Sequence, residues 1–253
     1  MKSIHLTIIV CAIALTSGQA QQTFIAKGKI EYEKVLSLHR SFESMIDDDN
    51  DRSWIETLKK NFPATITTYF NLYFEDGKTL YKPGREVQTA TPIPDWLLGP
   101  ASDNVIYTDI ATDQNTAMKH VFENTFLVQD SVRKIDWRIT MDTRTIAGFS
   151  CRKAVGKIMD SVYVIAFYTD QILTSGGPES FAGLPGMILG VAIPRINTTW
   201  FATKLELVQV KPEDLAPPKK GKKVNTKELQ EQLKGPMKDW GKWGQRNIWN
   251  IMI

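Results

Sequence analysis

The feature that most constrains the fold is a series of short segments in which apolar and polar residues alternate. In residues 65–74, Ile66, Phe70 and Leu72 share one side of an extended chain, and Asp76-Gly77 then leads into residues 79–81. Asp-Gly between two such segments is the strongest short-range signal of a β-hairpin. Further strand patterns occupy residues 24–33, 104–110, 117–128, 135–140, 149–158, 161–168 and 200–210. The sequence therefore predicts about nine strands.

The helical signal is much weaker than the strand signal. Inside the strand series, helical spacing is clear only at Trp54, Ile55, Leu58 and Phe62, ahead of Pro63. Strands that do not alternate with helices favour an antiparallel architecture, and half-apolar strands leave one sheet face toward water or a cavity. We expect a mainly β fold: an antiparallel curved sheet or incomplete barrel with one or two short helices. A two-sheet sandwich is the alternative.

An aspartate cluster, Asp47–Asp51, precedes the predicted helix. Acidic residues stabilise a helix N-terminus, which explains the cluster without a metal. A calcium-binding EF-hand loop counted from Asp47 would need glycine where Arg52 stands and glutamate where Leu58 stands. We therefore expect helix capping here.

Residues 176–189 concentrate glycine and proline between two strand patterns. Pro185 and Gly186 occupy the two central positions of a predicted type II turn, where proline presets φ and glycine supplies a positive φ. Met187 and Ile188 then return to the core. A buried structural corner is favoured over a ligand-facing loop.

The residues of this corner, Gly183-Leu184-Pro185-Gly186-Met187-Ile188, resemble the signature hexapeptide of the GLPGLI family, exported proteins of Bacteroidetes-type bacteria. Met187 stands where the family usually has leucine. Residues 145–154 and 167–172 are similar to two further segments of that family, so the resemblance covers about residues 120–194. It implies export and a shared fold. The family has no established activity, so the resemblance implies no catalytic residues.

The N-terminal residues have the three parts of a secretory signal peptide. A basic start at Lys2 precedes the apolar run Ile4–Leu15, and the small residues Gly18 and Ala20 fit a cleavage site after Ala20. The apolar run is too short to span a bilayer as a helix. We expect residues 1–20 to be a signal peptide and the protein to be periplasmic or secreted.

The expected mature chain has two parts, a β-rich domain at residues 21–210 and a C-terminal extension at residues 211–253. The extension carries ten Lys or Arg against five Asp or Glu, a net charge of +5, whereas the full chain has a net charge of only +3. That overall balance argues against nucleic-acid binding. The extension is rich in tryptophan, so we expect it to dock on the domain; contact with a membrane surface or a partner is the alternative.

Candidate catalytic and metal-binding residues are few. Cys151 is the one cysteine after residue 20, and nearby cations such as Arg152 are able to activate a thiol. Neither His39 nor His120 stands in a recognisable motif with it, and Ser180 lacks the flanking glycines of a nucleophile elbow. We expect no catalytic residue, no metal site and no cofactor, and a structural role for Cys151.

These patterns favour a non-catalytic exported envelope protein that binds or carries an apolar ligand. Trp96, in a loop rich in glycine and proline, and the aromatic residues Phe167 and Phe181 are the expected ligand-facing positions. The alternative is an interaction module that docks on an outer-membrane protein assembly through its C-terminal extension. An enzyme that uses Cys151 is the least favoured hypothesis.

Overall fold

The computed structural model describes residues 24–44, 51–87, 93–159 and 161–253. The expected signal peptide and Asp47–Asn50 lie outside these residues. The strands are β1 (Lys27–Ser37), β2 (Thr65–Glu75), β3 (Lys78–Pro83), β4 (Val105–Asp109), β5 (Gln114–Val121), β6 (Asn124–Asp130), β7 (Arg138–Ile146), β8 (Phe149–Ile158), β9 (Val162–Thr169), β10 (Met187–Ile193), β11 (Thr198–Glu206) and β12 (Lys222–Val224). The helices are α1 (Leu38–Glu43), α2 (Asp51–Asn61), α3 (Asp95–Leu98), α4 (Thr226–Met237) and α5 (Gly241–Met252), with 3-10 turns η1 (Pro194–Ile196), η2 (Pro212–Leu215) and η3 (Lys238–Trp240).

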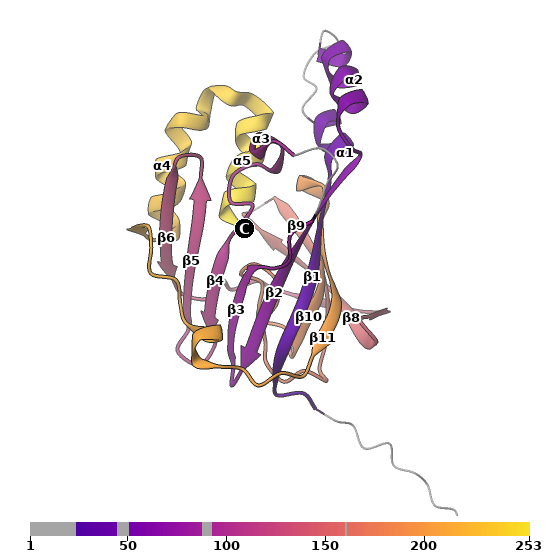
Figure 1. Cartoon of the computed structure of the whole chain (residues 1–253), viewed down its shortest axis with the longest axis vertical. Helices are drawn as coiled ribbons and strands as arrows, with labels where there is room; N and C mark the ends of the chain where they lie inside the picture. Colours follow the sequence, from indigo (N-terminus) through magenta and orange to yellow (C-terminus); the bar gives the residue numbers. More distant parts are fainter. Residues whose placement is uncertain (1–23, 45–50, 88–92, 160) are drawn as a thin grey trace, which may run out of the picture.

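The twelve described strands form one sheet in the order β12-β6-β5-β4-β3-β2-β1-β11-β10-β9-β8-β7. All neighbouring pairs are antiparallel except β12 and β6. The sheet is open, because β12 and β7 stand at its two ends and do not pair with each other. The predicted mainly β class is confirmed, and Figure 1 shows β1 to β6 side by side across the front of the molecule.

The prediction of nine strands is wrong for three local reasons. Residues 117–128, predicted as one strand, are β5 and β6, because the chain reverses at Phe122 with a φ of 54°. Residues after the glycine- and proline-rich corner form β10, and residues 222–224 of the C-terminal extension form β12 beside β6. The helix count is also corrected, since the described residues contain five α-helices where one or two were expected.

The hairpin between β2 and β3 is confirmed. Asp76 and Gly77 have φ values of 49° and 75°. Positive φ at both central residues is the mark of the type I′ turn that matches the twist of paired strands. This turn fixes the register in which Phe74 lies opposite Thr79.

One core joins both halves of the sheet. Fully buried side chains from β1, β2 and β4 belong to the same apolar cluster as side chains from β9 and β10, so the sheet curves around them. The C-terminal helices contribute to this cluster through Leu229 and Leu233 of α4 and Ile251 of α5. A second cluster lies under α1 and α2, at the end of β1 seen in the upper right of Figure 1.

The hexapeptide at residues 183–188 forms a tight buried corner. The Gly186 N–H donates to the Leu184 carbonyl over 2.8 Å, so the turn closes around Pro185 alone as a γ-turn instead of the predicted type II turn. Gly186 has the predicted positive φ, 131°, and a Cβ there would clash with the main-chain oxygen of Thr169. Tyr32 of β1 donates its hydroxyl to the Ile188 carbonyl at 2.6 Å and ties the corner to the sheet.

No helix in the described part of the chain is long and apolar enough to cross a membrane.

Candidate ligand-binding site

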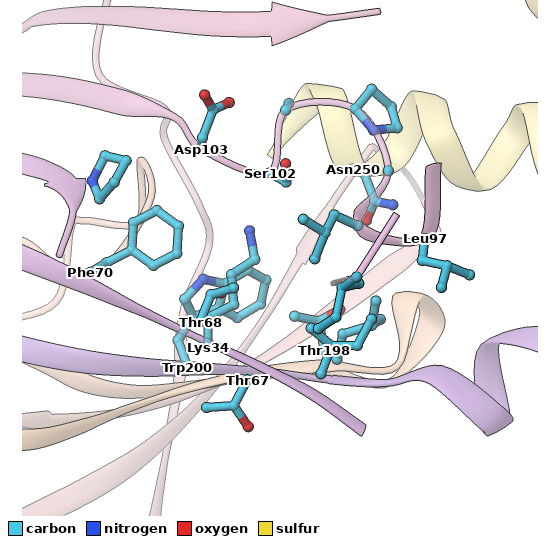
Figure 2. A pocket seen from close by; sticks show the side chains of 18 of the residues that line it. Lys34, Thr67, Thr68, Phe70, Leu97, Ser102, Asp103, Thr198, Trp200 and Asn250 are labelled. Atoms are coloured by element: carbon cyan, nitrogen blue, oxygen red, sulfur yellow. The ribbon is translucent and has the colours of Figure 1, made fainter. Parts of the chain in front are cut away.

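A cavity of about 410 Å³ opens among β1, β2, the residues that follow β3, the α3 segment and α5. Its position follows from the topology. Strands β1 and β2 form the floor of the cavity, and α5, the last helix of the chain, forms one wall. Much of the lining is apolar or aromatic and includes Ile66, Phe70, Ile93, Leu97, Ile196 and Trp200. Figure 2 shows Phe70, Leu97 and Trp200 around this space.

A partly buried ion pair lies within this apolar lining. Lys34 of β1 places its Nζ 3.2 Å from Oε1 of Glu179, and the Asn104 amide donates to Oε2 of the same carboxylate at 2.9 Å. The Lys34 Nζ also lies 5.4 Å from the ring centroid of Phe70 and 5.2 Å from that of Trp200. Figure 2 shows Lys34 beside Trp200. The ammonium is therefore held by a carboxylate and two aromatic faces.

Glu179 reaches this pair from the glycine- and proline-rich segment. Its side chain is almost fully buried, and its φ is 54°, an uncommon value for a residue with a Cβ. The segment that the sequence marked as a structural corner thus also supplies one charged residue to the cavity.

The α5 wall contributes a second cation, which is buried. Arg246 lines the cavity, is 9% exposed, and donates from Nη2 to the Ser41 hydroxyl at 2.7 Å and to the Ile196 carbonyl at 3.1 Å. The Arg246 Nε and the neighbouring Asn247 Nδ2 are buried and have no hydrogen-bond partner among the described residues. Burial lowers the pKa of Arg246 to about 10.

The three predicted ligand-facing residues lie in different places. Trp96 lines the cavity, is 47% exposed, and packs edge-on against Phe62 with ring centroids 5.8 Å apart. Phe167 packs against Phe201 on another part of the sheet, and Phe181 is buried in the core. Neither Phe167 nor Phe181 lines the cavity.

Cys151, His39 and His120 each have different contacts. Cys151 is fully buried, and burial raises the pKa of its thiol to about 11. His39 lies 3.0 Å from the Phe62 carbonyl, and His120 lies 2.7 Å from the Asp103 carboxylate. Over residues 24–44, 51–87, 93–159 and 161–253, no three His, Cys, Asp or Glu side chains gather to hold a metal ion.

Sequence reasoning missed Lys34, although a signal was present. Gly28, Ile30 and Tyr32 alternate inward along β1, and Lys34 occupies the next inward position. A lysine where the alternation requires an apolar residue is a mark of a buried polar site. Arg246 and Asn247 gave no comparable signal, because their place in the cavity depends on how α5 packs.

A family model and several solved structures match this chain. Residues 156–190 match the family described as "Protein of unknown function (Porph_ging)", a segment that contains Glu179 and the hexapeptide. A search of curated proteins found no match.

The fold resembles that of PNGF-II, solved in space groups P21 and C2. The P21 structure has 14% identity and a TM-score of 0.50, with 79% of this chain covered; the C2 structure has 12% identity and a TM-score of 0.50, with 88% covered. The match spans 32% of PNGF-II in both cases. At these identities the likeness is one of fold alone.

Proposed function

We propose that this protein is a non-catalytic binding protein that holds an apolar or amphipathic small molecule in the cavity between β1, β2 and α5. The cavity itself carries the proposal. Its volume of about 410 Å³ falls within the range of about 300–1,000 Å³ typical of small-molecule sites. Its apolar walls with a few polar groups also match the usual composition of such sites.

The state of Cys151 supports the non-catalytic part of the proposal. A thiol must ionise to act as a nucleophile, and burial raises the pKa of this thiol to about 11. The side chain is also fully buried, so a substrate has no direct access to it.

We further propose that the chain is a member of the GLPGLI family and is exported to the periplasm or secreted. The hexapeptide supports the first point, since it lies within the segment that matches a family of unknown function. The signal-peptide pattern of residues 1–20 supports the second. Intact-mass measurement of the protein from its own cells tests export, with Gln21 expected as the first residue.

Titration with N-phenyl-1-naphthylamine, a neutral apolar dye that fluoresces in apolar surroundings, tests the binding function. Thr68 lines the cavity from β2, so Thr68→Phe fills part of the space. We expect saturable dye binding to the unmodified protein and at least tenfold weaker binding to Thr68→Phe. Thr143→Phe is the matched control, because Thr143 is an exposed residue of β7 outside the cavity.

Two outcomes contradict the proposal. One is the absence of saturable dye binding to the unmodified protein. The other is equal affinity of Thr68→Phe and Thr143→Phe, which would place the dye elsewhere. Thermal unfolding of each variant shows whether lost binding reflects lost structure.

A second candidate function is docking on an envelope protein assembly through the C-terminal extension. One observation favours it: Trp240 and Phe122 are 45% and 55% exposed, with ring centroids 5.6 Å apart. Exposed aromatic pairs are common anchors of protein interfaces. Capture of membrane proteins by the unmodified protein but not by Trp240→Ser, with equal dye binding by both, would support this function; equal capture would discard it.

A further inference from the structure

The α5 wall of the cavity contains a positive charge, Arg246, with no counter-ion among the described residues. The pKa of Arg246 is lowered by burial, with no offset from a carboxylate of the described residues. Its two hydrogen-bond acceptors, the Ser41 hydroxyl and the Ile196 carbonyl, are both neutral. A buried cation is costly unless it is paired, so this guanidinium is incompletely compensated.

The unpartnered polar atoms of this wall are all donors. Arg246 Nε is an N–H group with no acceptor in residues 24–44, 51–87, 93–159 and 161–253, and the adjacent Asn247 Nδ2 is a second such donor. Both residues line the cavity and are at least nine-tenths buried. Buried donors are normally satisfied, so two unsatisfied neighbours on one wall mark a place for an acceptor that the described part of the chain does not supply.

The other cation of the cavity provides an internal comparison. Lys34 already has a carboxylate oxygen at 3.2 Å, and Asn104 donates to the other oxygen of that carboxylate. The Lys34 pair is therefore close to neutral, while Arg246 is not. A negatively charged group is expected at the α5 wall and not at Lys34.

We propose that the ligand of this cavity is an amphipathic molecule with a carboxylate head, bound by Arg246 Nε and Asn247 Nδ2, whose apolar chain lies along the aromatic and aliphatic walls. This inference rests on the proposed function and adds the chemical class of the ligand. A carboxylate supplies the missing counter-ion and accepts both hydrogen bonds in its plane. The apolar side chains Phe70, Leu97 and Trp200 suit the chain.

Displacement of the neutral dye by two matched molecules tests the inference. Dodecanoate and dodecanol have the same chain and differ in the head group. We expect the unmodified protein to bind dodecanoate at least tenfold more tightly than dodecanol, the effect of a charge-assisted hydrogen bond. Equal affinities for the two molecules would overturn the inference while leaving apolar binding in place.

Two variants test where the carboxylate head of the ligand binds. Arg246→Met keeps an unbranched side chain that reaches about as far as Nε and removes the charge, so it should lose the preference for dodecanoate and still bind dodecanol and the dye. Arg85→Gln is the matched control, because Arg85 lines the mouth of the same cavity but is exposed and already paired with Glu31 at 3.1 Å. It should keep the preference. If Arg85→Gln lost the preference for dodecanoate and Arg246→Met kept it, the head group would bind at the mouth of the cavity. That result would contradict the inference.

Asn247→Leu is a second test that leaves the charge in place. It should reduce the preference for dodecanoate by about threefold to tenfold and leave dodecanol binding unchanged. Failure of the dye itself to bind the unmodified protein would contradict the proposed function, which is a different result from the loss of head-group preference.

Discussion

At the scale of single residues, Gly186 is a position of the hexapeptide where we expect any side chain to be costly. Its φ of 131° is strained for any residue with a Cβ, and that Cβ would also clash with the Thr169 carbonyl. We expect Gly186→Ala to lower the free energy of unfolding by about 3 kcal/mol, measured by urea denaturation. Gly77→Ala is the control, because Gly77 has a φ of 75° but open space around it. Gly77→Ala should cost about 1 kcal/mol. An equal cost at both positions would show that the structure around Gly186 adjusts and relieves the clash with Thr169.

Lys119 makes the stability of the protein depend on pH. It is buried on β5 and donates from Nζ to the Ile251 carbonyl at 2.8 Å, and burial lowers its pKa from 10.5 to about 8. Between these pKa values the unfolded chain binds a proton that the folded chain does not bind. The contribution of Lys119 to stability is therefore present above pH 10.5 and is lost as the pH falls toward 8.

Lys119→Met removes this titration. The unfolding free energy of the unmodified protein, minus that of the variant, should rise by about 2 kcal/mol between pH 7.5 and pH 10. Parallel urea denaturation series at several pH values measure this difference. A difference that stays constant over that range would mean that Lys119 titrates normally.

At the scale of secondary-structure elements, α4 depends on its N-cap. Asn225 accepts from the Glu228 N–H at 2.8 Å, and the Glu228 carboxylate accepts from the Asn225 N–H at 2.9 Å, which is a capping box. We expect Asn225→Ala to cost about 1 kcal/mol of unfolding free energy, and Asn225→Asp to cost less because it keeps an acceptor. Thermal unfolding followed by circular dichroism measures both, and equal losses would argue against a role for the cap.

Elements were predictable from sequence where burial follows the local pattern. β8 was predicted at its observed bounds, 149–158, and the Asp76-Gly77 turn carries its own backbone signal. The turn at Phe122 has no glycine or proline to reveal its positive φ, so β5 and β6 were predicted as one strand. β12 buries only Val224, and three residues with one buried side chain show no alternation.

The candidate site was predictable only in part, for a related reason. Trp96 was expected to face a ligand from the composition of its loop, and it lines the cavity. Lys34 showed a break in the alternation of β1, which is a local signal. Arg246 and Lys34 are far apart in the sequence. They line the same cavity only because of how α5 packs, and no local sequence pattern predicts that packing.

At the scale of the whole molecule, the C-terminal helices and the sheet share one core. Leu229, Leu233 and Met237 of α4 and Ile251 of α5 are buried within it. Each buried apolar side chain contributes about 1.5–3 kcal/mol, so their combined loss approaches the total stability of a typical domain. We expect a chain that lacks residues 225–253 to be unfolded or aggregated in circular dichroism and size-exclusion chromatography. A folded, monomeric truncated chain would show that the sheet is stable without α4 and α5.

The strand order also has a consequence for how the chain folds as it is synthesised. Strands β1 to β6 neighbour one another in the first half of the sheet, and the two outer edges of this half, β1 and β6, are covered only by β11 and β12. Both covering strands are translated late. A nascent chain therefore passes through a stage in which a half-sheet exposes two unpaired edges, and such edges recruit other chains. Strands β1 and β11 are far apart in the sequence, so we expect them to pair slowly. This pairing should limit the rate of folding to a state that resists aggregation.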